Sequence, residues 1–141
     1  MWTASLENPE AITSVFDTEP SLDDVYLYGI ELLEDGPTVN FKIRLKDYPQ
    51  NPPARWKYIH GESNTVVITL RALGINRLDI SGWSTENFVS CKISRTDEEE
   101  LSVVIKGNST EIDAVCDFLR VTSRISLHTY EEQCLIKNRL I

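Results

Sequence analysis

The sequence predicts a mainly β protein, an antiparallel sheet or sandwich of about seven to eight strands with a short N-terminal helix. Three observations predict this class: apolar and polar residues alternate over several short stretches, turn residues separate those stretches, and no amphipathic helix lies between them. The 141 residues suffice for one domain with its own core. Since no linker or internal repeat divides the chain, we expect residues 1–141 to form a single domain.

The first expected element is a helix from about Pro9 to Phe16. Asn8 is suited to cap its free amides, Pro9 has no amide hydrogen to lose at the first position, and Glu10 suits the positive end of the helix dipole. At the other end of the chain, the sequence leaves open a short C-terminal helix over residues 131–136.

The next two elements are strands of a hairpin around Asp35-Gly36, a dipeptide typical of tight turns. A two-residue turn there pairs positions whose numbers add to 71, so the expected pairs are Tyr26–Leu45, Tyr28–Ile43, Ile30–Phe41 and Leu32–Val39. All eight side chains then share one face. A slip of one residue would set apolar side chains against charged ones, which favours this register.

The remaining strands follow an extended proline-rich loop over residues 48–53. We expect strands over 65–73, 77–81, 88–94 and 101–106, then two pieces between 112 and 127. Gly74, Gly82, the acidic run 97–100 and Gly107 mark the breaks between them. Strands this closely spaced indicate antiparallel neighbours.

Acidic residues are concentrated at the start of the chain. The protein carries 22 acidic and 14 basic residues, a net charge of −8. Positions 1–40 contain no Lys or Arg and nine acidic residues: Glu7, Glu10, Asp17, Glu19, Asp23, Asp24, Glu31, Glu34 and Asp35. We expect Lys42, Arg44 and Lys46 on the neighbouring strand to neutralise part of this charge. The remaining field favours a basic partner and disfavours nucleic acid, whose phosphates need clustered Lys and Arg.

Cysteine usage and hydropathy restrict the cellular setting. Cys91, Cys116 and Cys134 lack the spacing of a zinc site or a disulfide framework, and the first two lie among alternating apolar residues as small hydrophobes do. No apolar run approaches the ~18 residues of a membrane span, and no secretion signal begins the chain. We therefore expect a cytoplasmic protein with no metal and no membrane partner.

The sequence contains no recognisable catalytic or cofactor motif. His60 and His128 have no partner at a known spacing, and the run 97–100 has the form of a solvated turn and not of a calcium loop. Trp56 and Trp83 fit either a packing role or a protein-binding hot spot. We expect no enzyme activity and no cofactor.

Several short motifs follow one another along the chain: Trp2 before a short helix, Pro20-Ser21-Leu22-Asp23, Asp35-Gly36, Pro52-Pro53-Ala54-Arg55-Trp56, Asn64-Thr65-Val66 and Leu78-Asp79-Ile80-Ser81-Gly82-Trp83. In this order they resemble the immunity protein 50 family of bacterial polymorphic toxin systems, over most of the chain. The resemblance implies a small cytoplasmic protein that binds the cognate protein toxin encoded beside it and neutralises it. Many such toxins act on nucleic acids through basic clefts, so a nuclease is one toxin class that an acidic binder would suit.

The resemblance and the acidic segment together predict a partner-binding role for five residues: Asp23, Asp24, Glu31, Glu34 and Asp35. A second hypothesis is a small ligand-binding protein or enzyme of unknown substrate, with a pocket around Tyr26, Tyr28, Trp56 and His60. A third is a subunit that self-associates through an uncovered strand edge. The sequence leaves the oligomeric state and the identity of the toxin open.

Overall fold

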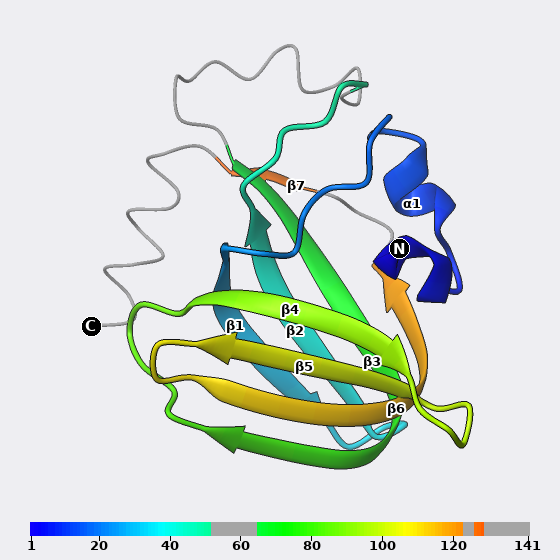
Figure 1. Ribbon diagram of the computed structural model, residues 1–141, viewed down its shortest axis with the longest axis vertical. Helices are drawn as coiled ribbons and strands as arrows, with labels where there is room; N and C mark the ends of the chain where they lie inside the picture. Colours follow the sequence, from blue (N-terminus) through cyan, green and yellow to red (C-terminus); the bar gives the residue numbers. More distant parts are fainter. Residues whose placement is uncertain (52–64, 123–125, 129–141) are drawn as a thin grey trace.

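The computed structural model describes residues 1–51, 65–122 and 126–128. The expectations for Trp56, His60, Cys134 and the C-terminal helix lie outside these residues. Within them, the mainly β class and the antiparallel strand pairing are confirmed (Figure 1). The elements are η1 (Trp2–Ser5), α1 (Glu10–Thr13), β1 (Val25–Leu33), β2 (Thr38–Leu45), β3 (Thr65–Ser81), β4 (Phe88–Arg95), β5 (Leu101–Gly107), β6 (Glu111–Val121) and β7 (Ser126–His128). No helix in these ranges is long and apolar enough to cross a membrane.

The expected number of strands, seven to eight, is too high. Six long strands form the sheet in the described part of the chain, and β7 adds only three residues beside the start of β3. The prediction broke the chain at Gly74, but β3 continues through it as one strand of 17 residues. Gly74 has a φ of +68°, which a residue without Cβ adopts without strain, so the strand bends there and does not end.

The six long strands close into a ring. Their order is β2-β1-β4-β5-β6-β3, and β2 also pairs with β3. The first half of β3 pairs with β2 and its second half pairs with β6, so β3 belongs to two layers. Figure 1 shows β1 and β2 behind β4, β5 and β6, with β3 bending from the rear layer to the front one. The sequence left open a sheet or a sandwich. The structure shows one sheet that folds over on itself to make two layers.

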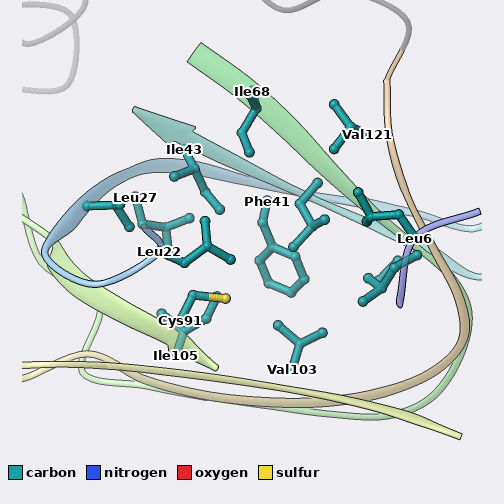
Figure 2. Packing of buried hydrophobic residues seen from close by; sticks show 14 of the residues in the cluster. Leu6, Leu22, Leu27, Phe41, Ile43, Ile68, Cys91, Val103, Ile105 and Val121 are labelled. Carbon is teal, nitrogen blue, oxygen red and sulfur yellow. The ribbon is translucent and has the colours of Figure 1, made fainter. Parts of the chain in front are cut away.

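The core fills the space between these two layers. Phe41 and Ile43 of β2 are fully buried, as are Val103 and Ile105 of β5 in the opposite layer. Figure 2 shows the Phe41 ring pointing into this space toward Val103. Leu6, Ile12, Phe16 and Leu22 of the N-terminal segment join the same cluster. The segment therefore covers one open end of the ring.

The N-terminal helix forms, but it is shorter than predicted and Asn8 does not cap it. Helix α1 spans Glu10–Thr13, with Pro9 at the N-cap position. The Asn8 side chain instead donates from Nδ2 to the Val121 carbonyl at 2.6 Å and accepts from the Val121 amide at 3.0 Å. Since the end of β6 offers both a donor and an acceptor, the Asn8 amide pairs with it as a strand backbone would.

The register predicted for the hairpin is correct near the turn and wrong near the start of β1. Ile30 pairs with Phe41 and Leu32 with Val39, as expected. A β-bulge at Tyr28 then shifts the pairing, so that Leu27 lies opposite Ile43 and Tyr26 opposite Arg44. The predicted pairs Tyr28–Ile43 and Tyr26–Leu45 are therefore absent. The bulge places the purely apolar Leu27 in the core and leaves Tyr28 only partly buried, which lowers the cost of desolvating its hydroxyl.

Candidate partner-binding surface

Aromatic side chains gather on the outside of the ring where β1 meets β4. These two strands pair at Val25–Val89 and Tyr26–Phe88. The Tyr26 and Phe88 rings make an edge-to-face contact with their centroids 4.9 Å apart. Phe88 is nevertheless 57% exposed, and Trp83, in the connection before β4, is 47% exposed. Large aromatic side chains left this exposed are typical of binding surfaces.

A cleft of about 270 Å³ opens beside these rings. Its walls are Tyr26, Leu27 and Tyr28 on β1, and Trp83, Ser84, Thr85 and Asn87 on the connection between β3 and β4. The Tyr26 hydroxyl donates to the Thr85 carbonyl at 3.1 Å and so joins the two walls. This volume admits one or two side chains of a partner or a small ligand.

The connection that carries Trp83 is held in place by a buried asparagine. Asn87 donates to the Ser84 carbonyl at 2.7 Å, and its Oδ1 accepts from the Thr110 hydroxyl at 2.6 Å. At Gly82 the chain runs so close to the carbonyl of Ser109 that any side chain there would collide with it. The cleft wall is therefore fixed before a partner arrives, which lowers the entropy cost of binding.

Arg44 packs against the tyrosines from β2. Its guanidinium carbon lies 4.0 Å from the centroid of the Tyr26 ring and 5.9 Å from that of Tyr28. Burial raises the pKa of Tyr28 above its ordinary value, and the charge of Arg44 opposes part of that rise. Tyr28 is therefore a neutral hydroxyl at neutral pH, suited to hydrogen bonding and not to proton abstraction.

The five predicted acidic residues do not form one patch. Asp23 and Asp24 precede β1, and the Asp24 amide donates at 3.3 Å to Oγ of Ser90, which lies on the same strand as Phe88. Glu31, Glu34 and Asp35 lie at the far end of β1. Ten residues of extended chain separate Asp24 from Glu34, which places them about 30 Å apart. Only Asp23 and Asp24 lie near the Tyr26–Phe88 pair beside the cleft, and neither of them lines the cleft itself.

The side chains of these five residues also differ in their partners. Glu31 accepts from Asn40 Nδ2 at 2.7 Å, and Asn40 in turn accepts from Arg71 Nε at 3.0 Å. None of the five carboxylates forms an ion pair with another described residue. The expected neutralisation by Lys42, Arg44 and Lys46 therefore involves no direct ion pair to these carboxylates within the described ranges.

The sequence identified only part of the aromatic cleft. Tyr26 and Tyr28 were expected to line a pocket, and they do, with Trp83 beside them. Phe88 was expected only as a strand residue. Its outward position follows from the buried positions of Val89 and Cys91, which alternate with Phe88 and Ser90. That alternation in the sequence could have predicted that Phe88 faces outward.

Two cysteines lie in the described ranges, both away from the solvent. Cys91 and Cys116 are buried free thiols. Burial raises the pKa of each to about 12, helped by Asp23 near Cys91 and by Asp117 near Cys116. Neither thiol is therefore ionised at neutral pH, and no group of three metal-ligating side chains occurs among the residues described.

Comparison with known proteins identifies the family. A family model described as Immunity protein 50 matches residues 8–127, which include the whole of the ring and the aromatic cleft. No curated protein and no solved structure matches the chain. Because the match extends over far more than half of its length, this chain belongs to the Immunity protein 50 family.

Proposed function

We propose that this protein is a cytoplasmic immunity protein that binds a cognate bacterial toxin and neutralises it by direct contact, without catalysis. Membership of the family supports a toxin-neutralising role. The observation that carries the binding mode is the fixed aromatic cleft, with Asp23 and Asp24 on the border of the Tyr26–Phe88 pair beside it. Exposed Trp, Tyr and Phe side chains beside charged residues have the composition of a binding hot spot and its polar rim.

The charge of this border favours a basic partner surface. Asp23 and Asp24 are exposed and have no ion-pair partner among the residues described, so their field reaches the solvent. A basic cleft of the kind that nucleases use to hold phosphates would be attracted by it. Arg44 already packs against Tyr26 and Tyr28, so a Lys or Arg side chain of the toxin would contact the exposed Trp83 ring, since aromatic rings attract cations.

The experiment that tests this function is coexpression with the toxin. The probe is the toxin domain that the gene upstream of this one is expected to encode, produced in the same cells as this protein. We expect the two chains to copurify at equal stoichiometry, and we expect cells that produce the toxin domain to grow only when this protein is present. Growth arrest in its presence, or separation of the chains on a sizing column, would contradict the proposal.

A matched pair of variants tests whether the proposed surface is responsible for the protection against the toxin. Trp83→Ala removes a wall of the cleft, and Phe118→Ala removes a similarly exposed ring, 54% exposed, from β6. Protection lost with the first and kept with the second supports the assignment. Protection kept by both variants would place the contact elsewhere on the protein.

A further inference from the structure

Strand β1 is paired with a neighbour along most of one side, but along only a short part of the other side. On one side β2 accompanies it from Tyr26 to Leu33. On the other side β4 pairs with Val25 and Tyr26, and one more backbone bond joins the Leu27 amide to the Asn87 carbonyl at 2.9 Å. Beyond this point, no described strand pairs with residues 29–33 on that side. We call these residues the open edge of β1.

Apolar side chains are exposed along this open edge. Leu32 is 61% exposed and Leu33 is 39% exposed, although both belong to the hairpin. The last part of β3, after its pairing with β2 ends at Leu73, also has a strand on one side only. That part carries the ion pair between Arg77 and Asp79, at 2.7 Å. Charged side chains discourage an edge from pairing, whereas exposed leucines favour it.

The negative charge around the open edge disfavours pairing with a second copy of this chain and favours pairing with a basic segment. A second copy of the chain, paired antiparallel about the middle of the edge, would set Glu31 against its own equivalent, and like charges directly opposite each other are destabilising. The turn that follows carries Glu34 and Asp35, both exposed. The carboxylates of this turn would attract an extended segment that carries Lys or Arg, whereas they would repel a second copy of the chain.

We infer that the open edge of β1 is a docking site for an extended basic segment of the partner toxin, which adds to the sheet as a further strand. The identity of the partner rests on the proposed function. The segment would carry an apolar side chain beside Leu32 and a Lys or Arg beside Glu34 and Asp35. Backbone hydrogen bonds to the edge would supply affinity, and these two side chains would supply specificity.

The position of the edge joins the two groups of acidic residues into one surface. Leu27 and Tyr28 line the aromatic cleft, and residues 29–33 continue directly from them. A strand that lies along the edge therefore runs from the cleft, with Asp23 and Asp24 just before it on the chain, to the turn at Glu34 and Asp35. Acidic residues about 30 Å apart can then contact one partner at the two ends of β1.

The decisive variant is Leu32→Lys, and its matched control is Phe118→Lys. Both replace an exposed apolar side chain by a cation, but Phe118 lies on β6, outside the open edge of β1. The probe is the toxin domain encoded upstream, with affinity measured by calorimetry. We expect Leu32→Lys to bind at least tenfold more weakly, because it repels a basic segment and removes the apolar contact, and Phe118→Lys to bind within twofold of the unaltered protein.

A second measurement needs no variant and decides the matter if Leu32→Lys fails to fold. Amide hydrogen exchange of residues 29–33 is compared for the unaltered protein, free and bound to the toxin domain. Slower exchange in the complex supports strand addition. Unchanged exchange, or equal affinities of the two variants, overturns the docking site.

The outcomes also separate this inference from the proposed function. If the unaltered protein does not bind the toxin domain, the proposed function fails and the docking site fails with it. If it binds while the edge measurements show no effect, only the docking site fails. Light scattering on the protein alone tests the other occupant: a dimer that Leu32→Lys abolishes would overturn the choice of a toxin segment in favour of a second copy.

Discussion

The ring of Tyr26 meets the ring of Phe88 nearly at right angles, with an angle of 80° between their planes. This contact lies at Tyr26–Phe88, one of the two residue pairs by which β1 and β4 close the ring of strands. After one more backbone bond, from the Leu27 amide to the Asn87 carbonyl, no described strand pairs with this side of β1, and the aromatic cleft lies beside this point. The limited pairing of β1 with β4 is therefore what creates both the cleft and the open edge of β1.

The exposed tryptophan of the cleft should behave as a binding hot spot. We expect Trp83→Ala to weaken binding of the upstream toxin domain by about 2 kcal/mol. The side chain is about half exposed, so we expect the free energy of unfolding to change by only about 0.5 kcal/mol. Calorimetry and urea denaturation measure the two quantities. Equal binding losses for Trp83→Ala and for the control Phe118→Ala would count against the hot spot.

The acidic pair beside the cleft should control the rate of association. Asp24 has a φ of 56°, which asparagine tolerates, so the suitable double variant is Asp23→Lys with Asp24→Asn. We expect association with the toxin domain to slow several-fold at low salt and to depend less on ionic strength, because the long-range attraction is reduced. Stopped-flow kinetics at two salt concentrations measure this. A rate that neither the substitutions nor salt change would contradict the electrostatic role.

Glu31 should matter for stability more than for association. Its carboxylate accepts from Asn40, which bridges it to Arg71. We expect Glu31→Gln to lower the free energy of unfolding by about 1 kcal/mol, because a hydrogen bond to a charged acceptor becomes a neutral one. Glu34→Gln, at an exposed turn, is the control and should have little effect in urea denaturation. A loss for Glu31→Gln no larger than that of the control would contradict the stabilising role of the bond from Asn40.

Asn8 should anchor the N-terminal segment. Asn8→Ala leaves both the amide and the carbonyl of Val121 without their side-chain partner, and we expect a loss of about 1–3 kcal/mol in the free energy of unfolding. Asn8→Asp keeps the acceptor but loses the donor, so an intermediate loss is expected. Glu7→Ala is the control, since its backbone bond to Leu119 does not involve the side chain. Equal stabilities for Asn8→Ala and Glu7→Ala would exclude the anchoring role.

The two buried thiols should make stability fall at high pH. Burial raises the pKa of Cys91 and of Cys116 to about 12, from an ordinary value of 9.0. The unfolded chain therefore releases these protons first, so their contribution is complete below pH 9 and is lost as the pH rises toward 12. Urea denaturation under reducing conditions measures the slope. We expect a shallower slope for the double variant Cys91→Ala and Cys116→Ala, and identical slopes would refute the assignment.

The sequence predicted the local features that depend on neighbouring residues. Alternation identified the faces of β2, and the Asp35-Gly36 dipeptide fixed the register of Ile30 and Leu32 beside the turn. It could not predict the bulge at Tyr28. Both registers keep an apolar residue opposite Ile43, and the choice between Tyr28 and Leu27 depends on which side chain the opposite layer can bury. Asn8 was misassigned for the same kind of reason, because Val121 lies 113 positions away in sequence.

By itself the sequence determined the antiparallel β class, the acidic N-terminal segment, the buried cysteines and the family. These properties reside in residue types and short-range periodicity. The tertiary structure alone decided that β3 passes between two layers, that Asp23 and Asp24 lie near the Tyr26–Phe88 pair while Glu34 and Asp35 do not, and that β1 keeps an open edge. Each of these depends on which distant strands meet and where their pairing stops, and that is set by the packing of the whole ring.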